Sequence, residues 1–224
     1  MTQNAAMLWT GGKDSALALH EASQNGYRIR CLVTFAPPEP DFLAHPLVFI
    51  KMQAQVLALP HYVLSIHDPF EKSYETALCK LRNKTGINTV ITGDIAEVAG
   101  NPNWICERSR PIGMTVHTPL WGRDRLTLLR QLLDSEFQVL FSCVNTRWLG
   151  ENWIGRELND TAIADLRQIR ERTGLDLCGE EGEYHTLVTD GPHFMRRIAI
   201  CSASKRATDS LAYLDIHRLE LIEK

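Results

Sequence analysis

The sequence lacks the features that mark membrane-spanning, disulfide-bonded or zinc-binding proteins. No apolar run approaches the ~20 residues needed to cross a bilayer, and the first four residues lack the basic charge of a secretory signal. Its six cysteines stand singly, without a Cys-x-x-Cys pair, which excludes the common zinc, iron–sulfur and redox motifs. We therefore expect a cytoplasmic protein whose cysteines are reduced and which does not associate with a membrane.

A strong charge of one sign is also missing. The formal net charge is −3, so the chain offers no general electrostatic attraction for DNA or RNA. With 224 residues and 44% hydrophobic content, the chain can form one large or two modest domains with a real core. The sequence is compatible with a homo-oligomer and does not determine the oligomeric state.

What the sequence does contain is a glycine-rich turn, Thr10-Gly11-Gly12-Lys13-Asp14-Ser15. The apolar residues 5–9 before it are typical of a buried strand, and residues 16–22 after it have helical spacing, with Asp14 or Ser15 as the cap. Unpaired N–H groups and the helix dipole favour an anion at such a helix start. The turn predicts a seat for nucleotide phosphates; an ordinary capped Gly-Gly turn is the alternative.

Two common phosphate loops do not fit the residues around Lys13. A Walker loop has a further Gly separated by four residues from the Gly-Lys pair and a Ser or Thr after the Lys, where this chain has Met7 and Asp14. A dinucleotide fingerprint continues to a third glycine, where Ser15 and Ala16 stand. The residues therefore exclude both of these common phosphate loops.

Apolar runs and helical patterns alternate through the first half of the chain. The predicted strands span residues 5–9, 28–35, 62–66, 89–92 and 115–118, and the predicted helices 16–22, 46–59, 71–83 and 104–108. This alternation predicts an α/β fold with a doubly wound, mostly parallel, Rossmann-like sheet. Ligands bind such sheets beyond the carboxyl ends of the strands, where the glycine turn and Gly93-Asp94 fall.

The pattern changes after Pro119. Helices are predicted at residues 123–136 and 160–173, the second ending at Gly174, with strands at 138–144, 194–201 and 211–222. We expect these strands to form a smaller mixed sheet. The predicted domains are residues 1–118 and a smaller mixed α/β domain of residues 119–224.

An acidic segment, residues 178–186, lies in this second half. Its three carboxylates, Glu180, Glu181 and Glu183, repel one another unless a cation or a network of hydrogen-bond donors neutralises them. Judged by charge alone, an acidic loop in water is the simpler interpretation.

Two motifs together resemble a known family. The turn is similar to the S-G-G-x-D-S signature of N-type ATP pyrophosphatases, the PP-loop superfamily of adenine nucleotide alpha hydrolase-like proteins, with Thr10 in place of the first Ser. Residues 179–186 (GEEGEYHT), followed by Asp190-Gly191-Pro192, resemble the C-terminal hallmark of the diphthine–ammonia ligase family. The likeness extends in order through residues 45–60, 86–93, 137–145, 149–150 and 155–156.

The chain departs from that family's pattern at two places. Residues 92–97 (TGDIAE) replace a Ser-Asp and the start of a helix, and His185 stands where the family usually has Glu. Exchanging Glu for His removes an anion and supplies a group that titrates near neutral pH. The identity of the acceptor substrate therefore stays open.

The resemblance implies an ATP-dependent carbon–nitrogen ligase that adenylates a carboxylate, releases pyrophosphate and transfers ammonia. The acceptor would be diphthine on elongation factor 2 or a small molecule, and the cofactors ATP and Mg²⁺. The implied catalytic residues are Lys13, Asp14, Ser15 and Glu183, with Asp14 also supporting the metal. The implied nucleotide-binding residues are Thr10, Gly11, Gly12, Lys13, Asp14, Ser15, Gly93 and Asp94. The implied substrate-binding residues are Glu180, Glu181, Gly182, Glu183, Tyr184 and His185.

Three other functions are open. A PP-loop enzyme acting on tRNA would be expected to have a basic face and often catalytic cysteines, which the sequence does not clearly contain. An ATP-binding regulator would keep the turn without releasing pyrophosphate. A ligase for a different small molecule is the strongest rival, because His185 indicates another substrate.

Overall fold

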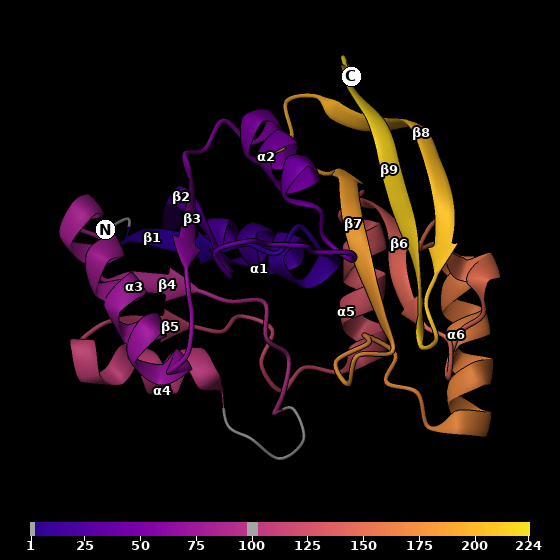
Figure 1. Ribbon diagram of the computed structural model, residues 1–224, viewed down its shortest axis with the longest axis horizontal. Coiled ribbons are helices and arrows are strands. Elements are labelled where there is room, and N and C mark those ends of the chain that lie inside the picture. The colour runs from indigo at the N-terminus through magenta and orange to yellow at the C-terminus, as the bar shows by residue number, and fades with distance from the viewer. Residues whose placement is uncertain (1–2, 98–102) are drawn as a thin grey trace. The chain divides into compact units, whose positions relative to one another are not determined.

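The computed structural model describes residues 3–97 and 103–224, and it divides into two compact units (Figure 1). The first unit comprises residues 1–10, 14–41 and 58–122, and the second residues 11–13, 42–57 and 123–224. The longest stretch of the second unit thus begins just after the boundary predicted at residue 118. Residues 11–13 and 42–57, placed by the sequence in the first domain, cluster with the second unit.

The first unit is built on a five-stranded parallel sheet in the order β3-β2-β1-β4-β5. Its strands are β1 (Gln3–Leu8), β2 (Tyr27–Ala36), β3 (His61–Ser65), β4 (Thr89–Ile91) and β5 (Thr115–His117). Its helices are α1 (Lys13–Gln24), whose first residue clusters with the second unit, α3 (Phe70–Thr85) and α4 (Trp104–Ser109), followed by the 3₁₀ turn η1 (Arg110–Ile112). The predicted parallel α/β fold is confirmed.

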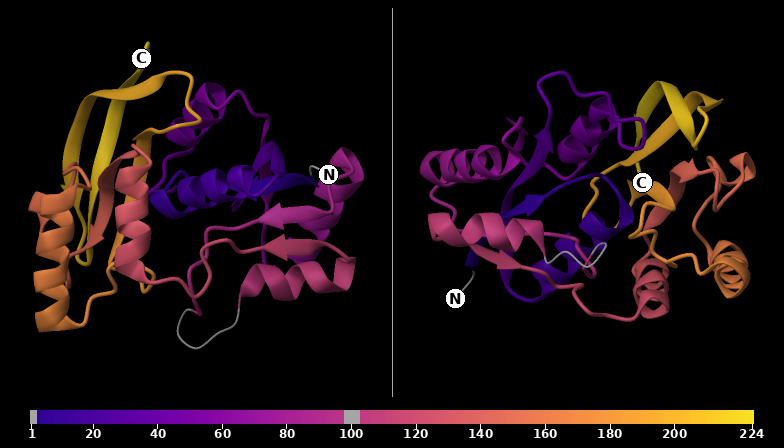
Figure 2. Two further views of the ribbon diagram at one scale, coloured as in Figure 1. Left: turned by 180° about the vertical axis from the view of Figure 1, so that it is seen from behind. Right: turned by 60° about the horizontal axis from the view of Figure 1, so that its bottom comes forward.

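The core of this sheet explains why its strands could be predicted. Strands β1 and β4 are central in the sheet, and residues 5–7 and 89–91 are buried. Parallel strands covered by helices have short, continuous apolar sequences rather than alternating ones. Ala6, Val33, Leu78 and Val90 belong to the cluster that packs β1, β2, β4 and α3 together. Figure 2 shows α4 beside β5 in this unit.

The second unit contains a four-stranded sheet in the order β7-β6-β9-β8. Its strands are β6 (Gln138–Asn145), β7 (Tyr184–Asp190), β8 (Arg197–Ala207) and β9 (Leu211–Ile222). Every pairing of these strands is antiparallel, so the predicted mixed sheet is wrong. For β8 and β9 the physical reason is the connection, because they are joined by a short hairpin loop, whereas parallel neighbours need a long crossover.

Strand β7 was not predicted from the sequence. It begins at Tyr184, inside the segment expected to be an acidic loop. The charged residues just before it and the turn residues just after it obscured the apolar run Leu187–Val188, which is fully buried. The hallmark motif is therefore half loop and half strand.

In the second unit, the start of α5 (Arg125–Asp134) and the end of α6 (Asp160–Thr173) are set by capping residues next to them. This unit also contains the helix α2 (Leu47–Val56) and the 3₁₀ turn η2 (Glu151–Trp153). Asp124 caps α5 by accepting a hydrogen bond from the Thr127 N–H at 2.8 Å, and this bond lowers the pKa of its carboxyl group. Gly174 ends α6 with a φ of 81°, as the sequence predicted.

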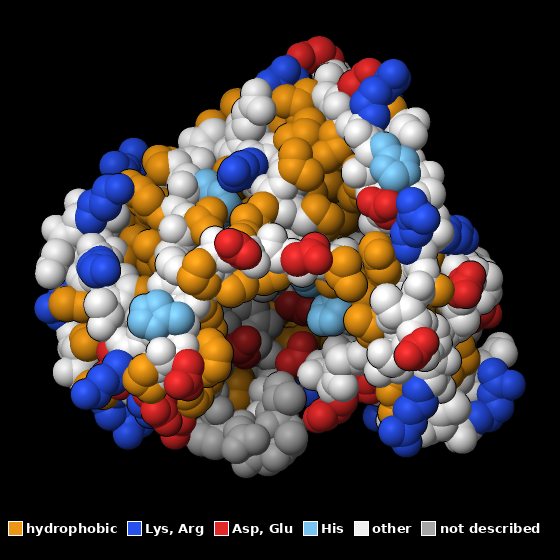
Figure 3. Space-filling view, viewed as in Figure 1, with side chains coloured by type: hydrophobic (Ala, Val, Ile, Leu, Met, Phe, Trp, Pro, Cys, Tyr) orange, Lys and Arg blue, Asp and Glu red, His pale blue; other side chains and the backbone are white. Residues whose placement is uncertain are grey.

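The surface agrees with the balanced composition. Figure 3 shows basic and acidic side chains interspersed over the visible face of the described residues, without one large patch of either sign. Among the described residues, none of the helices is long and apolar enough to cross a membrane.

Candidate functional site

The first half of the glycine turn is held against strand β7 inside the second unit. The carbonyl of Gly11 accepts hydrogen bonds from the Val188 N–H at 3.1 Å and from the Gln53 side-chain amide at 2.9 Å. The N–H of Lys13 donates to the Thr186 hydroxyl at 3.1 Å. Gly11 has a φ of 86°, a backbone conformation that glycine adopts without strain.

Space at the turn is as restricted as its conformation. A Cβ on Gly12 would lie 3.2 Å from both the His45 Nε2 atom and the Thr186 carbonyl oxygen. A Cβ on Gly11 would lie 2.6 Å from the Gln53 Oε1 atom. A side chain at either position would therefore force its neighbours to move, and at Gly11 the positive φ adds backbone strain.

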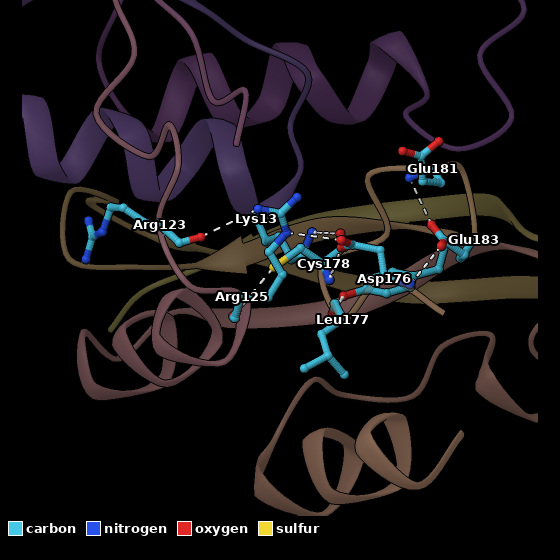
Figure 4. A network of polar contacts seen from close by, with 9 residues as sticks. Lys13, Arg123, Arg125, Asp176, Leu177, Cys178, Glu181 and Glu183 are labelled. Atoms are coloured by element: carbon cyan, nitrogen blue, oxygen red, sulfur yellow. Dashed lines mark hydrogen bonds and ion pairs between the residues drawn. The ribbon is translucent and has the colours of Figure 1, made fainter. Parts of the chain in front are cut away.

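The Lys13 side chain is directed into the acidic segment rather than into solvent. It is only 4% exposed, and its ammonium group donates to the carbonyl oxygen of Cys178 (Figure 4). It also lies 5.1 Å from the centre of the Tyr184 ring. Two donors that the sequence assigned to phosphate, the N–H and the ammonium group of Lys13, thus have protein partners in this structure.

Two histidines lie beside the turn. The His45 and His185 rings are 5.3 Å apart in an edge-on arrangement. The pKa of the His45 imidazole is lowered to about 3, mainly because burial disfavours its charged form. The neighbouring His185 and Lys13 lower it further, whereas a hydrogen bond with the Thr186 backbone raises it. His185 keeps part of its side chain in solvent, yet its packed surroundings and Lys13 lower its pKa too. The lowered pKa values favour the neutral form of both imidazoles.

The acidic segment is organised by backbone donors. Glu183 is 2% exposed, and its carboxylate accepts hydrogen bonds from the N–H groups of Asp176 at 2.8 Å and Glu181 at 3.0 Å (Figure 4). The buried Tyr184 hydroxyl donates to the Leu177 carbonyl. A donor network, one of the two solutions predicted from charge, therefore neutralises Glu183. The buried Glu183 and Tyr184 side chains therefore stabilise the conformation of the segment through hydrogen bonds to its backbone.

The other predicted residues of this segment are more open. Glu181 is exposed and Glu180 is half-buried. Gly182 has a φ of 84°, which allows the chain to reverse between the two acidic positions. The carboxylate of Glu181 is therefore open to solvent, whereas that of Glu183 is not.

The segment is anchored on its N-terminal side by an ion pair. The Arg125 guanidinium contacts the Asp176 carboxylate at 3.0 Å, and the same carboxylate accepts a hydrogen bond from the Cys178 N–H at 2.7 Å. Figure 4 shows these groups close to Lys13. The segment is thus positioned by residues from α5 as well as by its own turn.

The second half of the glycine turn lies in the first unit, at the carboxyl end of β1. Ser15 is 3% exposed, and its hydroxyl accepts a hydrogen bond from the Thr10 hydroxyl at 3.2 Å. Gly93 follows the neighbouring strand β4, and a Cβ there would lie 2.6 Å from the carbonyl carbon of Asp14 and 2.7 Å from the Ser15 nitrogen. Four predicted residues, Thr10, Asp14, Ser15 and Gly93, are thus brought together.

Asp94 is held at the same end of the sheet. Its carboxylate accepts a hydrogen bond from the Asn103 side chain, and its own N–H donates to the Thr92 hydroxyl at 3.1 Å. The Asn103 side chain also caps α4 through the Cys106 N–H at 2.9 Å. Asp94 is therefore tied to the start of α4.

Three further residues contact the turn, and the sequence analysis gave them no role there. Gln53, His45 and Thr186 all lie against residues 11–13. A signal for Gln53 was present, since a Gln on the buried face of an otherwise apolar helix must satisfy its amide. No comparable signal marks His45.

A glycine turn between the first strand and first helix of a parallel sheet is the arrangement of nucleotide-binding α/β proteins. Comparison with known families defines the class further. Residues 3–115 match the family described as "Diphthamide synthase N-terminal domain", and residues 124–222 match "Diphthamide synthase C-terminal domain". The chain belongs to the diphthamide synthase family.

Curated relatives are similar over nearly the whole chain. "Diphthine--ammonia ligase" of Mus musculus is 28% identical and that of Homo sapiens 26%, each alignment covering 98% of this chain and 92% of the relative. The protein of the same name from Schizosaccharomyces pombe is 25% identical over 93% of this chain and 38% of its own length.

A comparison with solved structures found a predicted subunit of tRNA methyltransferase from Methanocaldococcus jannaschii. It superposes with a TM-score of 0.46 and 16% identity, covering 85% of this chain and 98% of that one.

Proposed function

We propose that this chain is an ATP-dependent ligase that activates a substrate carboxylate and converts it into an amide with ammonia. The observation that supports this most directly is the close approach of Gly93 to the Asp14–Ser15 peptide, at the end of two adjacent parallel strands. Because Gly93 has no side chain, it approaches the start of α1 without covering it, which is compatible with a phosphate site there. The names of the curated relatives support the same reaction.

The reaction has two steps. A carboxylate oxygen attacks the α-phosphorus of ATP, the bond to the β-phosphate bridge breaks, and pyrophosphate leaves. The ammonia nitrogen then attacks the carbonyl carbon of the acyl-adenylate, AMP departs with its electron pair, and a proton is released. Activation is needed because a carboxylate is a poor electrophile until one of its oxygens becomes a good leaving group.

We assign nucleotide binding to Thr10–Ser15, Gly93 and Asp94, and catalytic roles to Lys13, Asp14 and Ser15. The Ser15 hydroxyl and the N–H groups at the start of α1 would stabilise the charge on the departing pyrophosphate. Lys13 would offset that charge from within the same turn.

Asp14 offers hard carboxylate oxygens at the start of α1, which fits Mg²⁺. This ion is commonly held by one or two carboxylates together with water and substrate phosphates. Among the described residues there is no group of three or more His, Cys, Asp or Glu side chains that could hold a metal ion. Asp14 would hold Mg²⁺ together with the phosphates of the nucleotide. When bound, Mg²⁺ supplies charge neutralisation on the phosphates.

The acceptor is assigned to the second half of the chain, residues 119–224. We propose that Glu180, Glu181, Gly182, Glu183, Tyr184 and His185 form the surface that receives it. Exposed Glu181 would attract a cationic part such as the trimethylammonium of diphthine. Buried Glu183, which the resemblance implied to be catalytic, would act as a positioning residue by accepting hydrogen bonds from the backbone of Asp176 and Glu181.

A second candidate is a ligase of the same chemistry for a different carboxylate. It is favoured by His185, which stands in place of the family's Glu and lies close enough to Lys13 for that cation to lower its pKa. A neutral imidazole there recognises different chemical groups from a carboxylate.

The test is an acceptor-dependent pyrophosphate assay with purified chain, ATP and ammonium. Diphthine-bearing elongation factor 2, a panel of small carboxylates and tRNA are offered in separate reactions, and amide formation is followed by mass spectrometry. Amidation of the elongation factor supports the first candidate, and amidation of a small acid supports the second. Both candidates are refuted if pyrophosphate release depends on none of the acceptors in the panel and no amide forms.

A further inference from the structure

The side chain of Gln53 is completely buried, with 0% exposure, although it is polar and lies on α2 between apolar neighbours. Its amide nitrogen donates one hydrogen bond to the Gly11 carbonyl at 2.9 Å and another to the Val188 carbonyl at 2.8 Å. A primary amide has two N–H donors. Both are therefore used to connect the glycine turn to strand β7.

These bonds fix the orientation of one peptide group. The Gly11 carbonyl also accepts from the Val188 N–H at 3.1 Å, so two donors approach this oxygen, which has two lone pairs. The peptide that follows Gly11 is planar and trans, so its N–H, which belongs to Gly12, points to the side opposite its carbonyl. Gln53 and Val188 thus direct the Gly12 N–H away from β7.

We propose that Gln53 is a positioning residue for the phosphate turn: by holding the Gly11 carbonyl, it orients the Gly12 N–H toward a bound polyphosphate. This inference rests on the proposed function, since it requires that the turn binds phosphate. Gln53 itself does not touch the nucleotide. An apolar side chain of similar size would fill the same space but would orient neither the Gly11 nor the Val188 carbonyl.

The first experiment uses the wild-type chain with isotope-labelled amides and follows its NMR spectrum during titration with inorganic pyrophosphate. The Gly12 amide resonance is expected to shift most within residues 11–13. No shift anywhere would remove the proposed phosphate site and this inference with it. Shifts at Ser15 and Gly93 without one at Gly12 would overturn the role of Gln53 alone.

The second experiment compares Gln53→Met and Gln53→Glu with the wild type. Both variants retain much of the side-chain size and lack the two donors. Turnover per folded molecule, with the folded fraction measured by circular dichroism, should fall by ~10- to 100-fold, as when a positioned group is lost. The KM for ATP should rise while the KM for the acceptor stays unchanged.

A matched control is Ser73→Ala, which removes another buried side-chain hydrogen bond, to the His67 N–H at 3.0 Å in the first unit. It should lower stability and leave turnover per folded molecule unchanged. If the Gln53 variants behave like this control, the residue is only structural and the proposal is wrong. If they do not fold, the NMR titration of the wild type decides it.

Discussion

The backbone N–H of Lys13 donates a hydrogen bond to the side-chain hydroxyl of Thr186, 173 positions further along the chain, at 3.1 Å. The two residues belong to the two motifs that the sequence analysis recognised separately. Thr186 is the last residue of the acidic hallmark, and Lys13 is the fourth residue of the glycine turn. The bond gives a physical reason for both motifs in one chain, because the hallmark threonine helps to hold the turn.

Thr186→Val should therefore weaken the turn as well as the fold. Thr186 is 2% exposed, and leaving the Lys13 N–H without its acceptor is expected to cost about 1–3 kcal/mol in the free energy of unfolding. Urea denaturation measures this cost, and pyrophosphate release reports on the turn. Thr186→Ser keeps the hydroxyl and is the control; equal losses in both variants would show that the hydroxyl is irrelevant.

Ser15→Ala and Asp14→Ala should each abolish acceptor-dependent pyrophosphate release, with losses of about 100-fold or more, without unfolding the chain. The reason is that both residues belong to the first turn of α1, where their peptide group lies beside Gly93. Ser23→Ala, in the last turn of the same helix, removes a hydroxyl bonded to the Leu19 carbonyl and should leave turnover intact. Wild-type turnover in both active-site variants would refute the assignment.

Gly93→Ala should disrupt the nucleotide site directly. Its new methyl group would lie 2.6 Å from the Asp14 carbonyl carbon, a backbone atom that can move only with the start of α1. Affinity for ATP, measured by calorimetry, should fall at least tenfold. Gly86→Ala has no atom within 4 Å of its new methyl group but strains a φ of 71°, so it should cost stability and spare ATP affinity.

Glu183→Gln should destabilise the acidic segment, because an amide NH₂ would face one of the two N–H donors that the carboxylate now satisfies. We expect a loss of about 1–3 kcal/mol in the free energy of unfolding and a weaker affinity for the acceptor, with ATP affinity retained. Glu181→Gln, at an exposed position, should leave stability unchanged. Unchanged acceptor affinity in Glu183→Gln would count against the role of this segment.

His45 should make stability depend on pH in a defined direction. Its pKa falls from 6.5 to about 3 on folding, so between these values the unfolded chain binds the proton that the folded chain excludes. Stability is therefore lost as the pH falls below about 6.5, and His45→Gln should reduce this loss. Melting temperatures of both proteins from pH 7 to pH 4 measure the difference.

His185→Gln provides a second arm of this experiment. Removing His185 takes away one of the causes that lower the pKa of His45, so the loss of stability still begins below about 6.5 but should be smaller in total. If melting temperature depends on pH in the same way in the wild type and in His45→Gln, the role of His45 is contradicted, independently of the result for His185→Gln.

The parallel sheet and the position of the glycine turn could be predicted because their signals are local. Buried strands such as β1 and β4 have short apolar sequences, and helix ends such as Gly174 are marked by one residue. Strand β7 was missed because its first residues follow a run of charge. The antiparallel pairing of the second sheet could not be predicted from strand positions, since pairing depends on how the connections run.

The sequence by itself determined the parallel sheet, the glycine turn at its carboxyl edge and the acidic hallmark, because spacing and residue type act over a few positions. Only the tertiary structure decided that Gln53, His45 and Thr186 surround Gly11–Lys13, and that Glu183 is buried among backbone donors. Those contacts join residues far apart along the chain. Their partners are backbone atoms, which every residue possesses, so residue type alone does not reveal them.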